Sequence, residues 1–219
     1  MKYKLENRNL YIKLLLVVLV IFMKNVIEMM KAEKPSKSLI YPYHLNIAGK
    51  SHIPLPLDSR YIEYRKEWEK NPEEKKVSEF PLHLDIEATG VCNLMCSHCF
   101  RHSRRSEIGD MNFEIFKKII DEGEEYGLYA IDPSWMGESF LHPQIIEMID
   151  YAKSRKVVDV MIHTNGTLVD EKMSKRILNS GLDTIIFSVD AITEATYNTV
   201  KVGSDFREVN RNIQYLIFT

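Results

Sequence analysis

The chain has 219 residues, 45% hydrophobic and 27% charged, an ordinary mixture for one large globular domain or for a domain with an arm. Its formal net charge of −2 excludes a strongly basic surface that attracts nucleic acid, so we expect no nucleic-acid partner. Three cysteines are an odd number in a chain too long to need disulfide staples, which favours a reducing, cytoplasmic location and metal-binding or redox thiols.

The amino end, residues 1–33, contains the continuous apolar run "LLLVVLVIFM" at residues 14–23. A helix needs roughly 20 apolar residues to cross a bilayer, so this run is too short to span one. No small-residue cleavage site follows it, as a secretory signal requires. Three interpretations stay open: an interfacial membrane anchor through residues 14–23, a helix packed on the body, or an appendix ahead of a true start at Met29 or Met30.

An extended arm and a short charged helix are expected over residues 34–79. The first part of this segment is rich in proline and has no lasting helical period, which indicates extended chain. The stretch at 59–76 predicts a charged helix broken at Asn71 and Pro72, because proline removes a backbone donor. Its aromatic residues recur at helical spacing and are expected to pack on the body: Tyr61, Tyr64 and Trp68.

From Phe80 onward the pattern becomes strand, turn and helix, repeated, which predicts a core domain over residues 80–219. The four expected strands lie within residues 82–87, 129–138, 157–166 and 182–191. The first helix is expected to begin after Asn112 as N-cap and to end at Gly127, and a helix over 170–179 to stop at Gly181. Strands alternating with helices predict parallel βαβ units and an α/β fold. Four units are too few for a closed eight-stranded barrel, so we expect an open arc or part of a larger barrel.

Alternation along the strands predicts a polar face on the sheet, because successive side chains point to opposite sides. One side of the first, third and fourth strands carries His83, Asp85, Glu87, Met161, His163, Asn165, Thr184, Ile186, Ser188 and Asp190. Parallel strands are normally covered on both faces and apolar on both. A polar inner face is costly unless it is wet or holds a ligand, so we expect a ligand-holding lumen; a sheet with one solvated face is the alternative.

All three cysteines lie in "CNLMCSHC", just past the first strand: Cys92, Cys96 and Cys99. This is the carboxyl edge of the strands, where α/β sheets bind ligands. Thiolates are soft ligands that suit zinc or iron–sulfur clusters. Structural zinc usually has four protein ligands, which His98 or His102 could complete. Three thiolates on one loop suit a 4Fe–4S cubane that leaves one iron open to another molecule.

The loop resembles the CxxxCxxC signature of the radical S-adenosylmethionine (radical SAM) enzymes, and the likeness extends over about residues 80–219. This resemblance implies a partial barrel of six βα units. It also implies a 4Fe–4S cluster on the three cysteines, whose open iron takes the amino and carboxylate groups of S-adenosylmethionine (SAM). Such enzymes cleave SAM reductively to a 5′-deoxyadenosyl radical, which abstracts hydrogen from a substrate.

Further segments carry the same resemblance. "WMGESFLHP" is similar to the family's GGEP motif, with Gly137 and Glu138 retained, and implies contact with the methionyl amino group of SAM. Asn165 in "HTNG" and Ser188 in "FSVDA" match segments that imply contacts near the ribose or carboxylate of SAM. His98 stands where the family often has an aromatic residue beside the adenine.

The fifth and sixth units that the family pattern implies have no counterpart here, so we expect a carboxyl-terminally truncated radical SAM chain, catalytic if those units are supplied. The alternative is a non-catalytic module that binds an iron–sulfur cluster or zinc. The resemblance implies a small-molecule or peptide substrate and an electron donor such as flavodoxin or ferredoxin. The sequence names no substrate, product or oligomeric state, and does not say whether SAM is consumed or regenerated.

Overall fold

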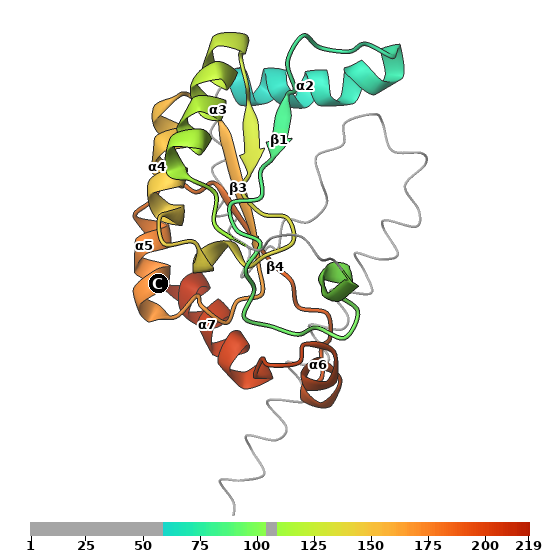
Figure 1. The fold of residues 1–219 in the computed structure, drawn as a ribbon, viewed down its shortest axis with the longest axis vertical. Helices are drawn as coiled ribbons and strands as arrows, with labels where there is room; N and C mark the ends of the chain where they lie inside the picture. The colour runs from blue at the N-terminus through green and yellow to red at the C-terminus, as the bar shows by residue number, and fades with distance from the viewer. Residues whose placement is uncertain (1–58, 104–108) are drawn as a thin grey trace, which may run out of the picture. The chain divides into compact units, whose positions relative to one another are not determined.

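The computed structural model describes residues 59–103 and 109–219 (Figure 1). The described residues belong to a compact unit that extends from Pro54 to Thr219. The apolar run at 14–23, the start of the arm and the alternative starting methionines lie outside the described residues. Within the described ranges no helix is both long enough and apolar enough for a bilayer crossing.

Four parallel strands form the sheet, in the spatial order β1-β2-β3-β4. Their bounds are β1 His83–Asp85, β2 Ala130–Asp132, β3 Asp159–Thr164 and β4 Thr184–Phe187. Sequential parallel strands need crossovers, and a helix follows each strand, as the alternating pattern predicts. The predicted α/β class with a parallel sheet is confirmed.

The helices that follow the strands pack on one face of the sheet (Figure 1). They are α3 Phe113–Tyr126, α4 Ile145–Ser154, α5 Glu171–Leu178 and α7 Phe206–Phe218. Their apolar stripes close over the strands, and Ile120, Met148 and Ile162 are fully buried there. Burying an aliphatic side chain of this size stabilises the fold by about 1.5–3 kcal/mol, so this interface is the main core.

The predicted ends of two helices can be compared with the structure. The Asn112 side chain accepts a hydrogen bond from the Glu114 amide at 2.7 Å, and Gly127 has a φ of 82°, so both predicted ends of α3 are confirmed. The predicted range of the third helix is confirmed, because α5 is capped by Asp170 and Asn179, and Gly181 lies two residues beyond the C-cap. A Cβ at Gly181 would lie 2.3 Å from Lys153 Cγ, so the glycine makes room for a neighbouring helix.

Helix α2, Ser59–Glu74, runs through Pro72 and does not break there as predicted. Pro72 lies in the last turn, so little helix follows it, and the Lys76 amide closes the end by donating to the Asn71 carbonyl at 2.9 Å. The expected packing of the aromatic residues is seen at Tyr64, which is 1% exposed and stacks on Tyr129 with ring centroids 5.7 Å apart. The sequence also missed a short helix, α6 Glu194–Val200.

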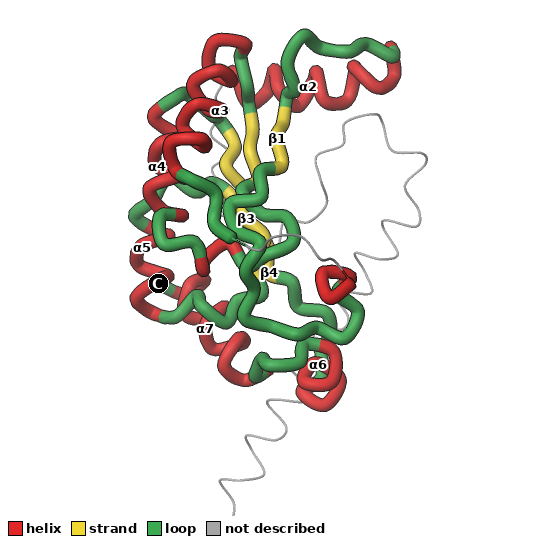
Figure 2. The backbone as a smooth tube through the Cα atoms, in the orientation of Figure 1, coloured by secondary structure: helices red, strands yellow, loops and turns green. Residues whose placement is uncertain are grey.

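The opposite face of the sheet is polar, as strand alternation predicts. The Asp85 side chain is 54% exposed and that of His163 47% exposed, while their neighbours Leu84 and Ile162 pack into the core. Helix α2 covers the amino-terminal end of this face, where Trp68 packs against His83 and Asp159 is 7% exposed. Among the described residues, solvent reaches the face toward its carboxyl end, at Asp85 and His163. Figure 2 shows loops gathered beyond the carboxyl ends of the strands, which is where the chemistry-bearing segments lie.

Candidate functional site

The candidate site is built on the loop that leaves β1. The two ends of this loop lie side by side, because the Gly90 amide donates to the Gly109 carbonyl at 3.0 Å and Thr89 bridges Asp110. The two ends of the loop are therefore held together where the loop leaves the sheet and returns to it. A short 3₁₀ turn, η1 Phe100–Ser103, follows the last cysteine, and Arg101 donates to the Leu94 carbonyl at 3.1 Å inside the loop.

Cys92, Cys96 and Cys99 are half-buried thiols on this loop, and no disulfide joins them. The Cys99 amide donates to the Cys96 carbonyl at 3.1 Å, which curls the chain between these two ligand positions. Burial raises the pKa of the Cys96 thiol, Lys201 lowers it, and the neighbouring Cys92 and Cys99 raise it further. Cys96 therefore interacts electrostatically with both of the other thiols.

The thiols are ligands of the kind that an iron–sulfur cluster takes. In the described part of the chain, no three His, Cys, Asp or Glu side chains form a group that could hold a single metal ion. His98, one of the two candidate fourth ligands in the zinc alternative, has its Nε2 3.3 Å from Asp190 Oδ2. The side chain of His102 is outside the described residues.

Gly137 and Glu138 follow β2 and lie against the base of the cysteine loop. A Cβ on Gly137 would lie 2.0 Å from the Thr89 carbonyl oxygen and 2.7 Å from that of Val91, so only glycine fits. The Glu138 amide donates to the same Val91 carbonyl at 2.8 Å. This contact holds the residue before Cys92, so Gly137 and Glu138 together position the start of the cysteine loop.

The Glu138 carboxylate is 2% exposed and binds the loop that follows β3. Its oxygens accept hydrogen bonds from Thr164 Oγ1 and from the Asn165 amide, both at 2.7 Å. Burial raises the pKa of Glu138, and these hydrogen bonds lower it. The carboxylate therefore joins two loops at the carboxyl edge of the sheet, in addition to any contact with a ligand.

Asn165 links the same loop to the cysteines. Its Nδ2 donates to Asn93 Oδ1 at 2.9 Å and lies 4.0 Å from Cys92 Sγ, and its Oδ1 accepts from the Thr167 amide at 2.9 Å. The structure thus brings Asn165, Glu138 and Cys92 together. Ser188 lies next along the edge, half-buried, with its amide bonded to the Thr164 carbonyl at 2.8 Å.

Two polar groups of the site were missed by the sequence analysis. Asp132, at the end of β2, is 5% exposed and its Oδ2 lies 2.7 Å from His163 Nδ1 on the open sheet face. Asp132 pairs with Asp85 and therefore lies on the same polar face. Strand alternation alone could have placed Asp132 on that face. Lys201 is 5% exposed and its Nζ lies 2.7 Å from Asp190; no sequence pattern pointed to it.

The sequence matches a family model over most of the described residues. The Radical SAM superfamily model covers residues 86–217, a range that contains the cysteine loop, Glu138, Asn165 and Ser188. The chain belongs to the radical SAM superfamily. The prediction made from the cysteine spacing is therefore confirmed at the level of the family.

Curated relatives of this radical SAM chain have varied names. A tungsten-containing aldehyde ferredoxin oxidoreductase cofactor-modifying protein from Pyrococcus furiosus is 36% identical over 55% of this chain and 34% of its own length. A probable GTP 3′,8-cyclase from Methanococcus maripaludis is 30% identical over 60% of this chain and 44% of its own. The subtilosin biosynthesis protein AlbA from Bacillus subtilis is 33% identical over 55% and 27%. The radical SAM chain spans less than half the length of these relatives.

Solved structures share the fold. SuiB from Streptococcus suis bound to S-adenosylmethionine aligns with a TM-score of 0.54 and 21% identity, over 69% of this chain and 35% of that one. SuiB bound to its precursor peptide SuiA aligns with a TM-score of 0.56 and 18% identity, over 90% and 41%. At these identities the likeness concerns the fold alone, and it agrees with a partial barrel of radical SAM type.

Proposed function

We propose that this chain is a radical SAM enzyme whose Cys92, Cys96 and Cys99 hold a 4Fe–4S cluster with one iron open to SAM. The observation that carries the proposal is the anchored loop with three thiols at the carboxyl edge of the sheet, inside the region matched by the family model. Together, the reduced cluster and SAM supply a 5′-deoxyadenosyl radical that abstracts hydrogen from the substrate. The protein's part is to hold these groups and shield them.

The residues around the thiols have distinct proposed roles. Gly137 and Glu138 fix the start of the cysteine loop, and both are proposed contacts for the methionyl amino group of SAM. Asn165 orients Cys92 through Asn93, and its carboxamide and the Ser188 hydroxyl are proposed contacts for the ribose or carboxylate of SAM. His98 is the proposed neighbour of the adenine, held by Asp190.

The substrate is proposed to enter over the open sheet face, which carries Asp85 and the Asp132–His163 pair. Among the similar proteins, SuiB is seen with a precursor peptide, and the probable cyclases are named for GTP, a small molecule. A peptide or a small molecule is therefore the proposed substrate class, and a flavodoxin or ferredoxin the proposed electron donor. We propose that residues 80–219 form the core domain, with the arm at 34–79 and residues 1–33 ahead of it, and that the protein acts in the cytoplasm.

Anaerobic reconstitution with iron and sulfide tests the proposal. We expect a brown protein with cubane iron and sulfide content, which on reduction converts added SAM to 5′-deoxyadenosine, detected by mass spectrometry. The matched control replaces all three cysteines with alanine and should give neither cluster nor product. A colourless chain that holds tight zinc would defeat the proposal, and a stable cluster without SAM cleavage would indicate a non-catalytic module.

A further inference from the structure

The end of α6 and the two-residue segment after it hydrogen-bond to the cysteine loop. The Met95 amide donates to the Val202 carbonyl at 2.9 Å, and the Ser97 amide donates to the Val200 carbonyl at 2.9 Å. These two bonds join the middle of the cysteine loop to residues 200–202 in antiparallel sense, since one number rises as the other falls. The position between the two bonds is occupied by Cys96 on one side and by Lys201 on the other.

Lys201 is fixed from both its backbone and its side chain. Its amide donates to the Tyr197 carbonyl at 2.7 Å, its carbonyl accepts from the Ser204 amide at 3.0 Å, and its ammonium lies 2.7 Å from Asp190 Oδ2. A lysine that is 5% exposed is unusual, because burying an ammonium costs several kcal/mol unless it is paired. Asp190 also approaches His98, so this one carboxylate is shared between two basic groups.

The charge of Lys201 belongs to a residue that lies opposite Cys96, because the Met95–Val202 and Ser97–Val200 bonds flank this pair of positions. Burial raises the pKa of Glu138 and the charge of Lys201 lowers it, so the field of this charge extends across the carboxyl edge of the sheet. Because the site is partly buried, such a charge is screened less than a surface charge.

We propose that Lys201 is a positioning residue that holds a permanent positive charge beside the thiols and raises the reduction potential of the cluster they bind. The inference rests on the proposed function, because it needs a cluster on Cys92, Cys96 and Cys99. Reduction adds one negative charge to a group that already carries thiolates. A nearby ammonium stabilises the reduced form more than the oxidised form, and charges and hydrogen bonds around the sulfurs are known to set such potentials.

The test compares variants of the full chain after anaerobic reconstitution, with the potential read by redox titration monitored by electron paramagnetic resonance. Lys201→Met should disfavour reduction about tenfold, a shift of about 59 mV to more negative potential for a one-electron couple. Lys201→Arg keeps the charge and should stay close to the wild type. Lys175→Met removes a lysine that is 59% exposed on α5, far along the chain from the cysteines, and should leave the potential unchanged.

Asp190→Asn gives the opposite sign, because it removes the carboxylate that balances Lys201 and should move the potential upward. This variant also decides the matter if Lys201→Met takes up no cluster. A wild-type chain without iron would overturn the proposed function and this inference with it. A loaded wild type whose potential equals those of Lys201→Met and Asp190→Asn would overturn the inference alone.

Discussion

At the scale of single residues, Gly137 shows how a backbone position can control a site. An alanine there would place its Cβ 2.0 Å from the Thr89 carbonyl oxygen, which is backbone and cannot rotate away. We expect Gly137→Ala to lower the free energy of unfolding by about 1–3 kcal/mol, measured by urea denaturation, and to reduce iron uptake. Gly109→Ala is the matched control, since a Cβ there meets nothing within 4 Å. Equal effects of the two changes would contradict this account.

The Asp132–His163 pair makes a pH-dependent prediction. The carboxylate of Asp132 bonded to Nδ1 raises the pKa of His163 above 6.5, burial lowers it, and Asp85 raises it further. A raised folded-state pKa stabilises the fold at pH below the unfolded value, and this contribution is lost as pH rises through the folded-state pKa. The stability advantage of the wild type over Asp132→Asn should therefore shrink as the pH rises from about 6.5 through the raised pKa of His163.

Two measurements check this. Proton NMR should show a lower His163 pKa in Asp132→Asn, and urea denaturation at several pH values should show the narrowing difference. In a His163→Gln background the effect of Asp132→Asn should no longer change over this pH range. An unchanged His163 pKa would mean that the pair has no electrostatic coupling.

Residues whose role is local were the easier ones to predict. The cysteine spacing, Gly137 and Asn165 stand in contiguous motifs, and the structure brings Asn165 to Cys92. Lys201 was not predicted, because its burial and its partner Asp190 come from segments that meet only in the folded chain. Strand alternation could have placed Asp132 on the polar face, but not beside its partner His163.

At the scale of elements, α2 and α7 each bury an asparagine with a different outcome. Asn71 in α2 is 7% exposed, and among the described residues neither of its side-chain polar atoms has a hydrogen-bond partner. Asn212 in α7 is 6% exposed, and its Nδ2 donates to the Gly166 carbonyl at 2.9 Å. Since an unpaired buried amide costs about 1–3 kcal/mol, leucine should improve α2 and damage α7.

We expect Asn71→Leu to raise the free energy of unfolding by about 1 kcal/mol and Asn212→Leu to lower it by about the same amount or more, measured by urea denaturation. The two variants make the same chemical change at similar burial, so each is the control for the other. A loss of stability in Asn71→Leu would show that this side chain has a partner in the folded chain.

Element boundaries were predictable where the deciding residue is local. The N-cap of α3 depends on Asn112 alone, and the apolar stripe of each long helix depends on its own spacing. The continuation of α2 through Pro72 was predicted wrongly, because the local rule that proline breaks a helix takes no account of its place in the last turn. Helix α6 has only 7 residues, too few to show a periodic stripe.

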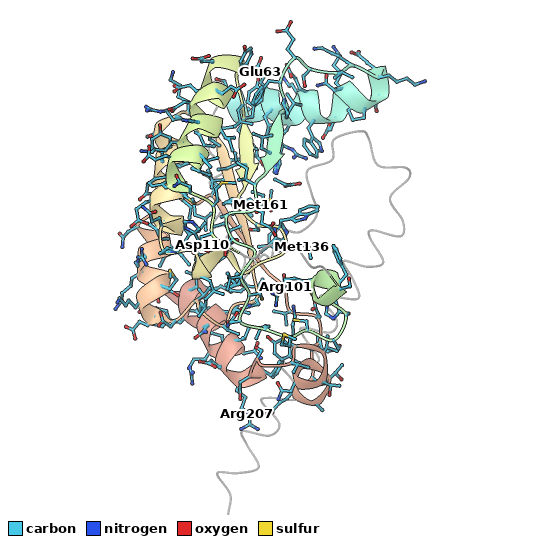
Figure 3. The ribbon with its side chains drawn as sticks, in the orientation of Figure 1. Glu63, Arg101, Asp110, Met136, Met161 and Arg207 are labelled. Carbon is cyan, nitrogen blue, oxygen red and sulfur yellow. The ribbon has the colours of Figure 1, made fainter. Side chains whose placement is uncertain are left out.

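For the described unit as a whole, four helices cover one face of the sheet, α2 covers the amino-terminal end of the other, and the cysteine loop is held at three places. The two ends of the loop bond each other, Val91 bonds Glu138, and Met95 and Ser97 bond residues 200–202. These contacts couple the loop to the segment after β2 and to the end of α6, and Figure 3 labels Arg101 on the cysteine loop and Met136 on the segment after β2. A ligand on the loop should therefore stabilise the whole unit.

The last prediction uses this coupling. A ligand that binds only the folded chain stabilises it by about 2.7 kcal/mol at 100 times its dissociation constant, which for a protein of this size corresponds to about 5–11 °C in melting temperature. SAM at that excess should raise the melting temperature of the cluster-loaded chain by this amount, measured by anaerobic scanning calorimetry. The variant with alanine at Cys92, Cys96 and Cys99 should show no increase, because the amino and carboxylate groups of SAM then have no iron to bind. An equal increase in that variant would show that SAM binds away from the thiols, and the assignment of the site would fail.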